Sequence, residues 1–159
     1  MSKKKEKSET PVIENRKARH EYIISETLET GIVLAGSEVK AVRDAKVSLG
    51  EGYVRVDPER NALYLVGVNI GEYAPAGGQQ HTPVRARKLL AHRREIAKLA
   101  KAVEVKGFTI VPLKMYFKDG FAKVLIGVAQ GRSAHDKRDR IAKRDAQRDI
   151  DRAMSRKMR

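Results

Sequence analysis

The sequence of 159 residues contains no cysteine and no tryptophan, and aromatic residues make up only 5% of it. Without cysteine there are no disulfides, no thiolate nucleophile and no cysteine-ligated zinc site. No apolar run approaches the roughly 18 residues that a membrane span needs, and the lysine-rich first residues contain no hydrophobic signal core. We therefore expect a cytoplasmic protein without a membrane partner.

Basic residues, by contrast, are abundant. The chain has 34 Lys and Arg against 20 Asp and Glu, which gives a net charge of +14 spread along its whole length. A cationic protein is attracted to phosphate-rich surfaces. The low aromatic content provides few platforms for stacking the bases of unstructured strands. Structured nucleic acid is therefore the leading partner.

The length suits one folded domain with short appendages. Residues 1–14 are rich in Lys, Glu and Ser and predict a disordered basic leader. Residues 15–132 contain nearly all the apolar periodicity and predict the folded body. Residues 133–159 form a basic C-terminal tail in which that periodicity stops.

Apolar alternation predicts most of the body to be β-structure. Two short strands are expected to meet at Gly31, and residues 52–70 read as a hairpin around a turn that contains Pro58. The clearest local signal is Asp119-Gly120 between two β-rich runs, because this dipeptide suits a type I′ turn. Pro112 cannot donate to a ladder and belongs on an edge or at a bulge.

Two helices are predicted among these strands. A short one within residues 37–45 has Ser37 as its expected cap, and a longer one spans 85–103. The longer helix has an apolar stripe and a basic face, which is either a solubilising surface or a phosphate-binding one. The stripe comprises Leu89, Ile96, Leu99 and Val103, and the basic face comprises Arg87, Lys88, Arg94, Lys98 and Lys101. The loop before it, residues 71–83, is rich in Gly and Pro and is expected to be mobile or functional.

Together these elements predict a mainly β fold. It is an OB-like six-stranded antiparallel barrel with a short helix, one longer inserted helix and a basic C-terminal tail that is disordered or helical.

Two enzyme motifs are present only in part. His20 begins a zinc-protease pattern, but Ile24 stands where the second histidine is needed. Gly127 and Gly131 resemble a phosphate loop, but they are one residue too close together and Arg132 replaces the required lysine. The sequence therefore predicts no catalytic site, no metal site and no cofactor.

The tail combines charge pairing with a thin apolar stripe. Asp136 and Asp139 precede Arg140 and Lys143 by four residues, which favours a helix weakly. The stripe comprises Ala142, Ala146, Ile150, Met154 and Met158. It offers too little area to hold the helix on a core. The residues alone leave two readings open, an arm that folds on a polyanionic partner and a solvated tail.

Several sequence blocks occur together in order, with short gaps. They cover residues 15–32, 36–43, 85–99, 106–132 and 135–138. In this combination the chain resembles the SmpB family, the SsrA-binding proteins of bacterial trans-translation. The resemblance implies a body that binds the tRNA-like domain of transfer-messenger RNA (tmRNA). It also implies a tail that enters the decoding centre and the empty mRNA channel of the ribosome, against small-subunit rRNA. Elongation factor Tu would be met only through the shared tmRNA.

The resemblance also implies the site residues. In the body the RNA-binding positions fall on Asn15, His20, Glu29, Arg87, Lys88 and Leu90, with Arg87 and Lys88 as phosphate contacts. In the tail the decoding-centre motif falls on His135, Asp136, Lys137 and Arg138, and an apolar anchor pair falls on Ala153 and Met154. Two departures stand out. The family's usual Gly-Lys-Lys before the tail motif is Gly131, Arg132 and Ser133 here, and a small Ala153 replaces a bulky aliphatic residue.

Two other functions compete with this one. The first is a generic OB-type RNA-binding or ribosome-associated structural protein. The second is a nucleotide hydrolase that uses the incomplete phosphate loop near Gly127.

Overall fold

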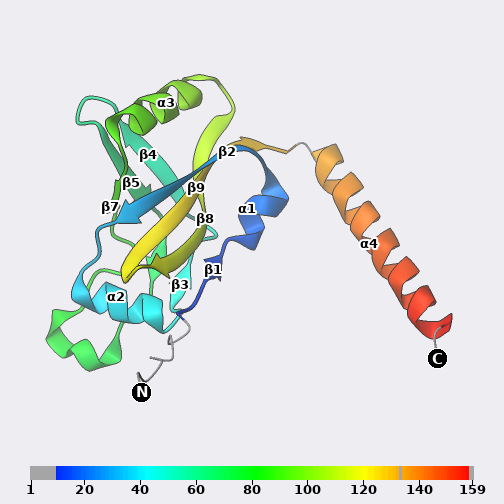
Figure 1. The fold of residues 1–159 in the computed structure, drawn as a ribbon, viewed down its shortest axis with the longest axis horizontal. Coiled ribbons are helices and arrows are strands. Elements are labelled where there is room, and N and C mark those ends of the chain that lie inside the picture. Colours follow the sequence, from blue (N-terminus) through cyan, green and yellow to red (C-terminus); the bar gives the residue numbers. More distant parts are fainter. Residues whose placement is uncertain (1–9, 133, 158–159) are drawn as a thin grey trace, which may run out of the picture.

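The largest element of the protein is a curved antiparallel sheet, seen in a computed structural model that describes residues 10–132 and 134–157 (Figure 1). Its seven strands run in the order β1-β8-β9-β2-β7-β5-β4. They are β1 (Ile13–Glu14), β2 (Tyr22–Ile32), β4 (Tyr53–Asp57), β5 (Ala62–Val66), β7 (Arg87–Leu90), β8 (Phe108–Lys118) and β9 (Phe121–Gly131). Two short strands, β3 (Val47–Ser48) and β6 (Asn69–Ile70), pair separately.

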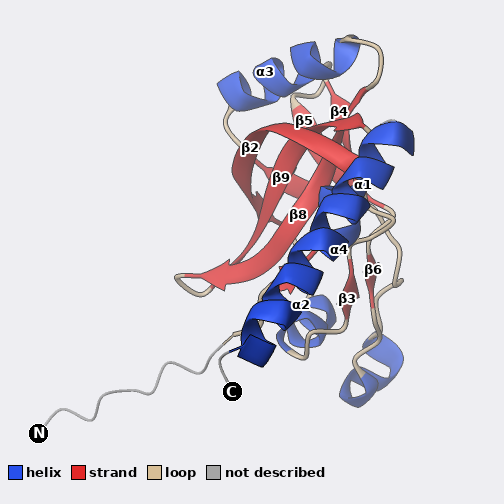
Figure 2. Cartoon of the chain, turned by 90° about the vertical axis from the view of Figure 1, so that its right-hand side faces the viewer, coloured by secondary structure: helices blue, strands red, loops and turns tan. Residues whose placement is uncertain are grey.

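Helices lie around this sheet. Figure 2 shows α3 above one end of the strands and α2 near the other. The helices are α1 (Arg16–Glu21), α2 (Gly36–Arg43), α3 (Arg93–Glu104) and α4 (Ala134–Lys157), with one 3-10 segment, η1 (Ala74–Gln79). Within the described ranges, no helix is both long and apolar enough to cross a membrane.

The sheet curls around a single main core. Inward-facing residues of every long strand meet there, together with residues of α2 and α3. The curl brings β4 into contact with β8, but no ladder joins these two strands in the part of the chain that the structure describes. The mainly β, OB-like prediction is confirmed. The prediction of a six-stranded barrel was only approximate, because the described sheet has seven strands and no ladder closes it.

The hairpin predictions are confirmed. Asp119 and Gly120 connect β8 to β9 with φ angles of 52° and 83°, as a type I′ turn requires. Strands β4 and β5 pair in register, Tyr53 with Val66 through Asp57 with Ala62. The ladder between β8 and β9 shifts at Pro112, where a missing donor costs no hydrogen bond.

The prediction of one helix across residues 85–103 is wrong at its start. Residues 87–90 form β7, and α3 begins only at Arg93. Burial in β7 alternates, with Arg87 and Leu89 inside and Lys88 and Leu90 outside. Adjacent leucines fit either period, and here pairing with β2 and β5 selects the strand. The rest of the predicted stripe holds, because Ile96 and Leu99 are buried.

Three smaller expectations also change. The leader is shorter than predicted, because Ile13 and Glu14 pair with β8 as strand β1; residues 1–9 lie outside the described part. The two strands expected around Gly31 form one continuous strand, β2. Ser37 does not cap α2, since Ala35 occupies that position and its N–H donates to the Glu38 carboxylate at 2.9 Å.

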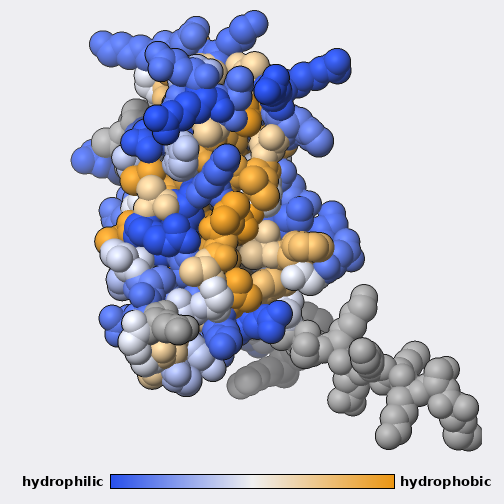
Figure 3. All heavy atoms as spheres, turned by 90° about the vertical axis from the view of Figure 1, so that its left-hand side faces the viewer, coloured by the Kyte–Doolittle hydropathy of each residue, from blue (hydrophilic) through white to orange (hydrophobic). Residues whose placement is uncertain are grey.

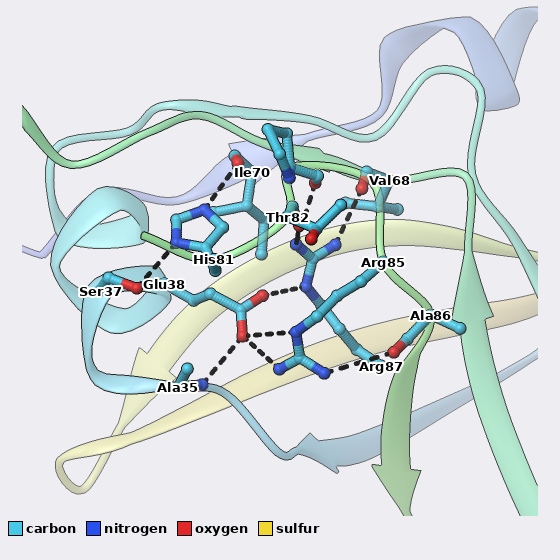
Figure 4. A network of polar contacts seen from close by, with 11 residues as sticks. Ala35, Ser37, Glu38, Val68, Ile70, His81, Thr82, Arg85, Ala86 and Arg87 are labelled. Atoms are coloured by element: carbon cyan, nitrogen blue, oxygen red, sulfur yellow. Dashed lines mark hydrogen bonds and ion pairs between the residues drawn. The ribbon is translucent and has the colours of Figure 1, made fainter. Parts of the chain in front are cut away.

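A buried ion pair fixes β7 against α2 (Figure 4). Arg87 is 0% exposed, and its Nε donates to a Glu38 oxygen. Its two terminal nitrogens donate at 2.9 Å to the carbonyls of Val68 and Pro83. Arg85 binds the second oxygen of Glu38 through Nε at 3.0 Å. The guanidinium of Arg87 is therefore both neutralised and hydrogen-bonded, as a buried charge must be.

A second polar contact anchors the Gly- and Pro-rich loop beside this pair. His81 is buried; its Nε2 bonds the Ile70 carbonyl at 2.9 Å and its Nδ1 bonds the Ser37 hydroxyl at 2.8 Å (Figure 4). The Tyr73 N–H also donates to the Gln80 side chain at 3.1 Å. The loop predicted to be mobile or functional is thus held to α2 and β6.

The pKa of Glu38 is lower than usual. Burial disfavours its charged form, but hydrogen bonds from Ala35, Arg85 and Arg87 outweigh that cost. The carboxylate therefore stabilises the fold above its ordinary pKa of about 4.3.

We expect Glu38→Ala to destabilise the protein strongly, because it leaves the buried Arg87 charge without its partner. Breaking a buried pair this way costs about 3–5 kcal/mol, which urea unfolding would measure. Glu51→Ala removes the exposed partner of Lys17 and is the matched control, expected to leave the midpoint nearly unchanged. Equal midpoints for the two variants would contradict the assignment.

Low pH should destabilise the protein by protonating the same Glu38 carboxylate. Because the pKa of Glu38 is lowered in the folded state, its contribution is lost as the pH falls through that value. We expect the wild-type protein to lose stability from about pH 5 downward, and Glu38→Gln to lose less over the same range. Thermal unfolding at several pH values measures this, and parallel curves for both proteins would contradict it.

Candidate nucleic-acid interface

One side of the sheet faces away from the core, and strand alternation decides which side chains it carries. In β7 these are Lys88 and Leu90, since their neighbours point inward. In β2, Glu29 and Gly31 alternate with the buried Thr30. We call this surface of β2, β7, β8 and β9 the outer face.

Strand pairing places the predicted residue Leu90 in one row with residues of three other strands on the outer face. Gly31 pairs with Leu90 on one side and with Lys123 on the other, and Lys123 pairs with Tyr116. Leu90 lies across Gly31, where a Cβ would approach the Leu90 Cβ to 3.2 Å. Gly31 therefore leaves space for the leucine, and the row runs without a break from β7 to β8.

Glu29 is the carboxylate of the outer face. It accepts a hydrogen bond from the Tyr116 hydroxyl and a weaker one from Lys118 Nζ at 3.4 Å. The bond from Tyr116 is the main cause that lowers the pKa of Glu29. Burial, together with Glu29, raises the pKa of Tyr116 to about 12. At neutral pH the tyrosine keeps its proton and the glutamate its charge, so this pair presents oriented hydrogen-bonding groups.

Two lysines lie beside that pair, since Lys118 and Lys123 both help to lower the pKa of Glu29. Lys88 lies farther along the outer face, in β7. Further along, Tyr64 pairs with Lys88, and the Arg55 guanidinium lies 5.2 Å from the Tyr64 ring centre. The sequence prediction missed Arg55, Tyr64, Tyr116, Lys118 and Lys123. The period of two in their strands is the signal that would have found them, because it places them opposite the buried residues.

An apolar patch adjoins these charges. Figure 3 views the side of the molecule where β7 and the end of β2 lie, and shows apolar atoms bordered by hydrophilic ones. Exposed apolar residues here include Leu90 of β7, at 53%, and Val33, which directly follows β2, at 48%. Lysines beside a small apolar surface suit a ligand with both phosphate and base or ribose surfaces.

Two predicted RNA-binding residues lie inside the protein. Asn15 is 3% exposed; its side chain caps α1 and donates to the Pro112 carbonyl at 2.8 Å. The predicted phosphate contact at Arg87 does not fit its placement, because that guanidinium is buried against Glu38. Both residues support neighbouring surfaces, and neither belongs to the outer face.

His20 lies on α1, beside the first turns of α4. It is half-buried and therefore open on one side to a ligand. His92, which precedes α3, is exposed, and its ring lies near the Glu95 carboxylate.

The tail forms α4, so the helical form of the prediction holds. At 24 residues it extends about 36 Å, and Figure 1 shows it leading away from the sheet. Its predicted motif, His135 to Arg138, lies in the first turns. The side chains of His135, Asp136 and Lys137 are outside the described part of the structure, as is Met158, while Arg138, Ala153 and Met154 are exposed.

No group of three potential metal ligands occurs among the residues that the structure describes. Their arrangement instead offers a basic sheet surface and a separate basic helix.

Comparison with known proteins shows relatives over nearly the whole chain. The family model described as SmpB protein matches residues 12–156. The SsrA-binding protein of Lactobacillus helveticus is 49% identical, over 92% of this chain and 95% of that protein. That of Listeria welshimeri is 48% identical, over 89% of this chain and 91% of that protein.

The fold is similar to a solved structure described as "tmRNA-SmpB: a journey to the center of the bacterial ribosome". The two chains are 47% identical with a TM-score of 0.67, and the match covers 79% of this chain and 87% of the other. Sequence and fold agree: this chain belongs to the SmpB family.

Proposed function

We propose that this protein is a non-enzymatic RNA-binding adaptor of trans-translation, acting in the cytoplasm. Its body binds the tRNA-like domain of tmRNA and delivers it to stalled ribosomes. Its tail occupies the decoding centre and the empty mRNA channel, against small-subunit rRNA. Elongation factor Tu meets the complex only through the shared tmRNA, and no cofactor takes part.

The observation that carries this proposal is the separation of two basic surfaces. The outer face is built on paired strands, whereas from residue 138 to residue 157 every side chain of α4 is exposed. A helix with so little burial gains its stability from a partner. One rigid RNA-binding surface joined to one exposed basic helix suits an adaptor that holds one RNA and enters another.

The chemistry of the outer face supports binding of structured RNA. Lys88 and Lys123 suit phosphates, and Leu90 offers an apolar contact. Glu29 repels phosphate, so its place in an RNA interface is to accept hydrogen bonds from base or ribose donors. The bond from Tyr116 orients that carboxylate in advance.

The tail supports entry into a narrow channel lined by RNA. Arg138 and the later arginines are exposed and suit rRNA phosphates. Ile150 and Met154 are exposed at 53% and 64%, and Met154 would supply most of the apolar anchor that the small Ala153 lacks. We assign His135 to stacking on an rRNA base, with Lys137 beside it neutralising phosphate.

For the body, we expect Lys88→Ala and Lys123→Ala to weaken binding to a tRNA-like RNA and each to reduce the salt slope by about one. Affinity measured from 50 to 200 mM salt tests this. Lys101→Ala removes an exposed lysine of α3, outside the outer face, and is the matched control. A flat salt profile for the wild-type protein would reject the phosphate contacts.

The same assay distinguishes residues that contact RNA from residues that only support the fold. Asn15→Ala should weaken RNA binding only together with a lower melting temperature, because its side chain holds backbone groups.

Competition between poly(U) and the tRNA-like RNA tests the alternative that the protein is a generic OB-type RNA-binding protein. Equal competition by the two RNAs would favour that alternative.

For the tail, we expect His135→Ala and truncation after Arg132 to leave affinity for the tRNA-like RNA nearly unchanged and to abolish tagging of stalled chains. The reason is a division of labour, in which the body binds the tRNA-like RNA and the tail acts in the ribosome. Binding assays and a reconstituted tagging reaction measure the two effects. An equal loss of both would refute the division.

A further inference from the structure

Arginines lie on the facing sides of helices α1 and α4. On α1, Arg16, Arg19 and His20 have spacings of three and four residues and share one side of the helix; on α4, Arg140 and Arg144 do the same. Together with Ile141 they line one pocket of about 200 Å³. The two helices are joined there by a hydrogen bond of 2.7 Å from Arg140 Nη1 to the Arg19 carbonyl.

Four guanidinium groups in one pocket repel one another unless an anion lies between them. None of the described residues that line the pocket is acidic. Arginine forks bind phosphate oxygens in pairs and remain charged at any physiological pH. The pocket is therefore suited to a phosphate approached from two helices at once.

An apolar groove continues from this pocket. It has a volume of about 420 Å³, shares Arg19 and Arg140 with the pocket, and is lined by Ile23, Ile24 and Leu125 among others. Ile23 is 43% exposed although it lies in a strand. A phosphate pocket that opens into an apolar groove matches one nucleotide of an RNA chain better than a free phosphate ion.

We propose that a backbone phosphate of RNA binds between α1 and α4 and holds the tail at a fixed angle to the body. The proposal rests on the RNA-binding function above and adds a site and a consequence. Because phosphate binding and the docking of α4 on α1 use the same arginines, each strengthens the other. Without RNA, charge repulsion favours release of α4. The division of labour between body and tail makes small-subunit rRNA the expected source of this phosphate, and the experiment distinguishes it from a phosphate of the tRNA-like RNA.

A double-mutant cycle tests whether one phosphate bridges both helices. The variants are Arg16→Ala, Arg144→Ala and their combination. Arg148→Ala, on α4 but outside the pocket, is the reference that measures the loss caused by removing any single tail arginine. Affinity is measured for a tRNA-like RNA and, separately, for isolated small ribosomal subunits from 50 to 200 mM salt. We expect each single variant to lose about 3- to 10-fold in affinity for the small subunit, with the salt slope lower by about one.

The combined variant should lose less than the product of the single losses, because the first change already removes the shared contact. The RNA whose affinity falls identifies the source of the phosphate. Losses no larger than those of Arg148→Ala for both RNAs, or strictly multiplicative losses, would overturn the bridge. If the wild-type protein fails to bind the tRNA-like RNA, the proposed function fails instead.

The absence of cysteine allows a direct measurement of the tail's direction. Spin labels on Lys101→Cys and Ser155→Cys report the distance between the body and α4. We expect the RNA identified above to narrow this distance distribution in the otherwise wild-type protein, and not when Arg16→Ala and Arg144→Ala are added. A distribution that RNA leaves unchanged would overturn the proposal. Melting temperatures equal to that of the parent protein exclude misfolding of the variants.

Discussion

The buried contact between Glu38 and Arg87 decides how the outer face of the sheet is presented. Arg87 points inward because a carboxylate and two backbone carbonyls accept hydrogen bonds from its guanidinium there. With Arg87 inside, the period of two in β7 turns Lys88 and Leu90 outward, onto the outer face. A one-residue slip would bury the lysine without a partner, so the ion pair also fixes the register. A buried charge thus acts as a device of specificity in this fold.

The two basic surfaces of the protein differ in how they are held. The outer face rests on long ladders among β2, β8 and β9, and its residues keep their spacing with or without a ligand. Helix α4 has almost no burial and meets the body at a pocket of like charges. A rigid surface suits recognition of a folded RNA by shape, and a loosely held helix suits insertion into a channel. The net charge of +14 serves both surfaces.

Local signals in the sequence predicted some elements well and others poorly. Asp119-Gly120 determined its hairpin because the turn depends on two adjacent backbone conformations. Residues 87–90 were misread because adjacent leucines among basic residues satisfy a helical stripe and a strand equally well. The decision came from distant segments, because β2 and β5 pair with β7 and Glu38, about fifty residues earlier in the chain, binds Arg87. Asn15 was likewise taken for a contact residue, although it bonds carbonyls of Leu49 and Pro112, which only the fold brings near it.

The sequence by itself determined the class of this protein, its basic character, its main hairpins and its resemblance to the SmpB family, because these depend on composition, neighbouring residues and the order of motifs. Only the tertiary structure decided which basic residues are available to a ligand. Arg87 and Lys88 are neighbours with the same charge, yet one is buried in an ion pair and the other is exposed on the outer face. The meeting of α1 with α4 was equally beyond the sequence, since about 120 residues separate arginines that line one pocket. Such groupings arise from strand pairing and packing between distant segments, and no local pattern encodes them.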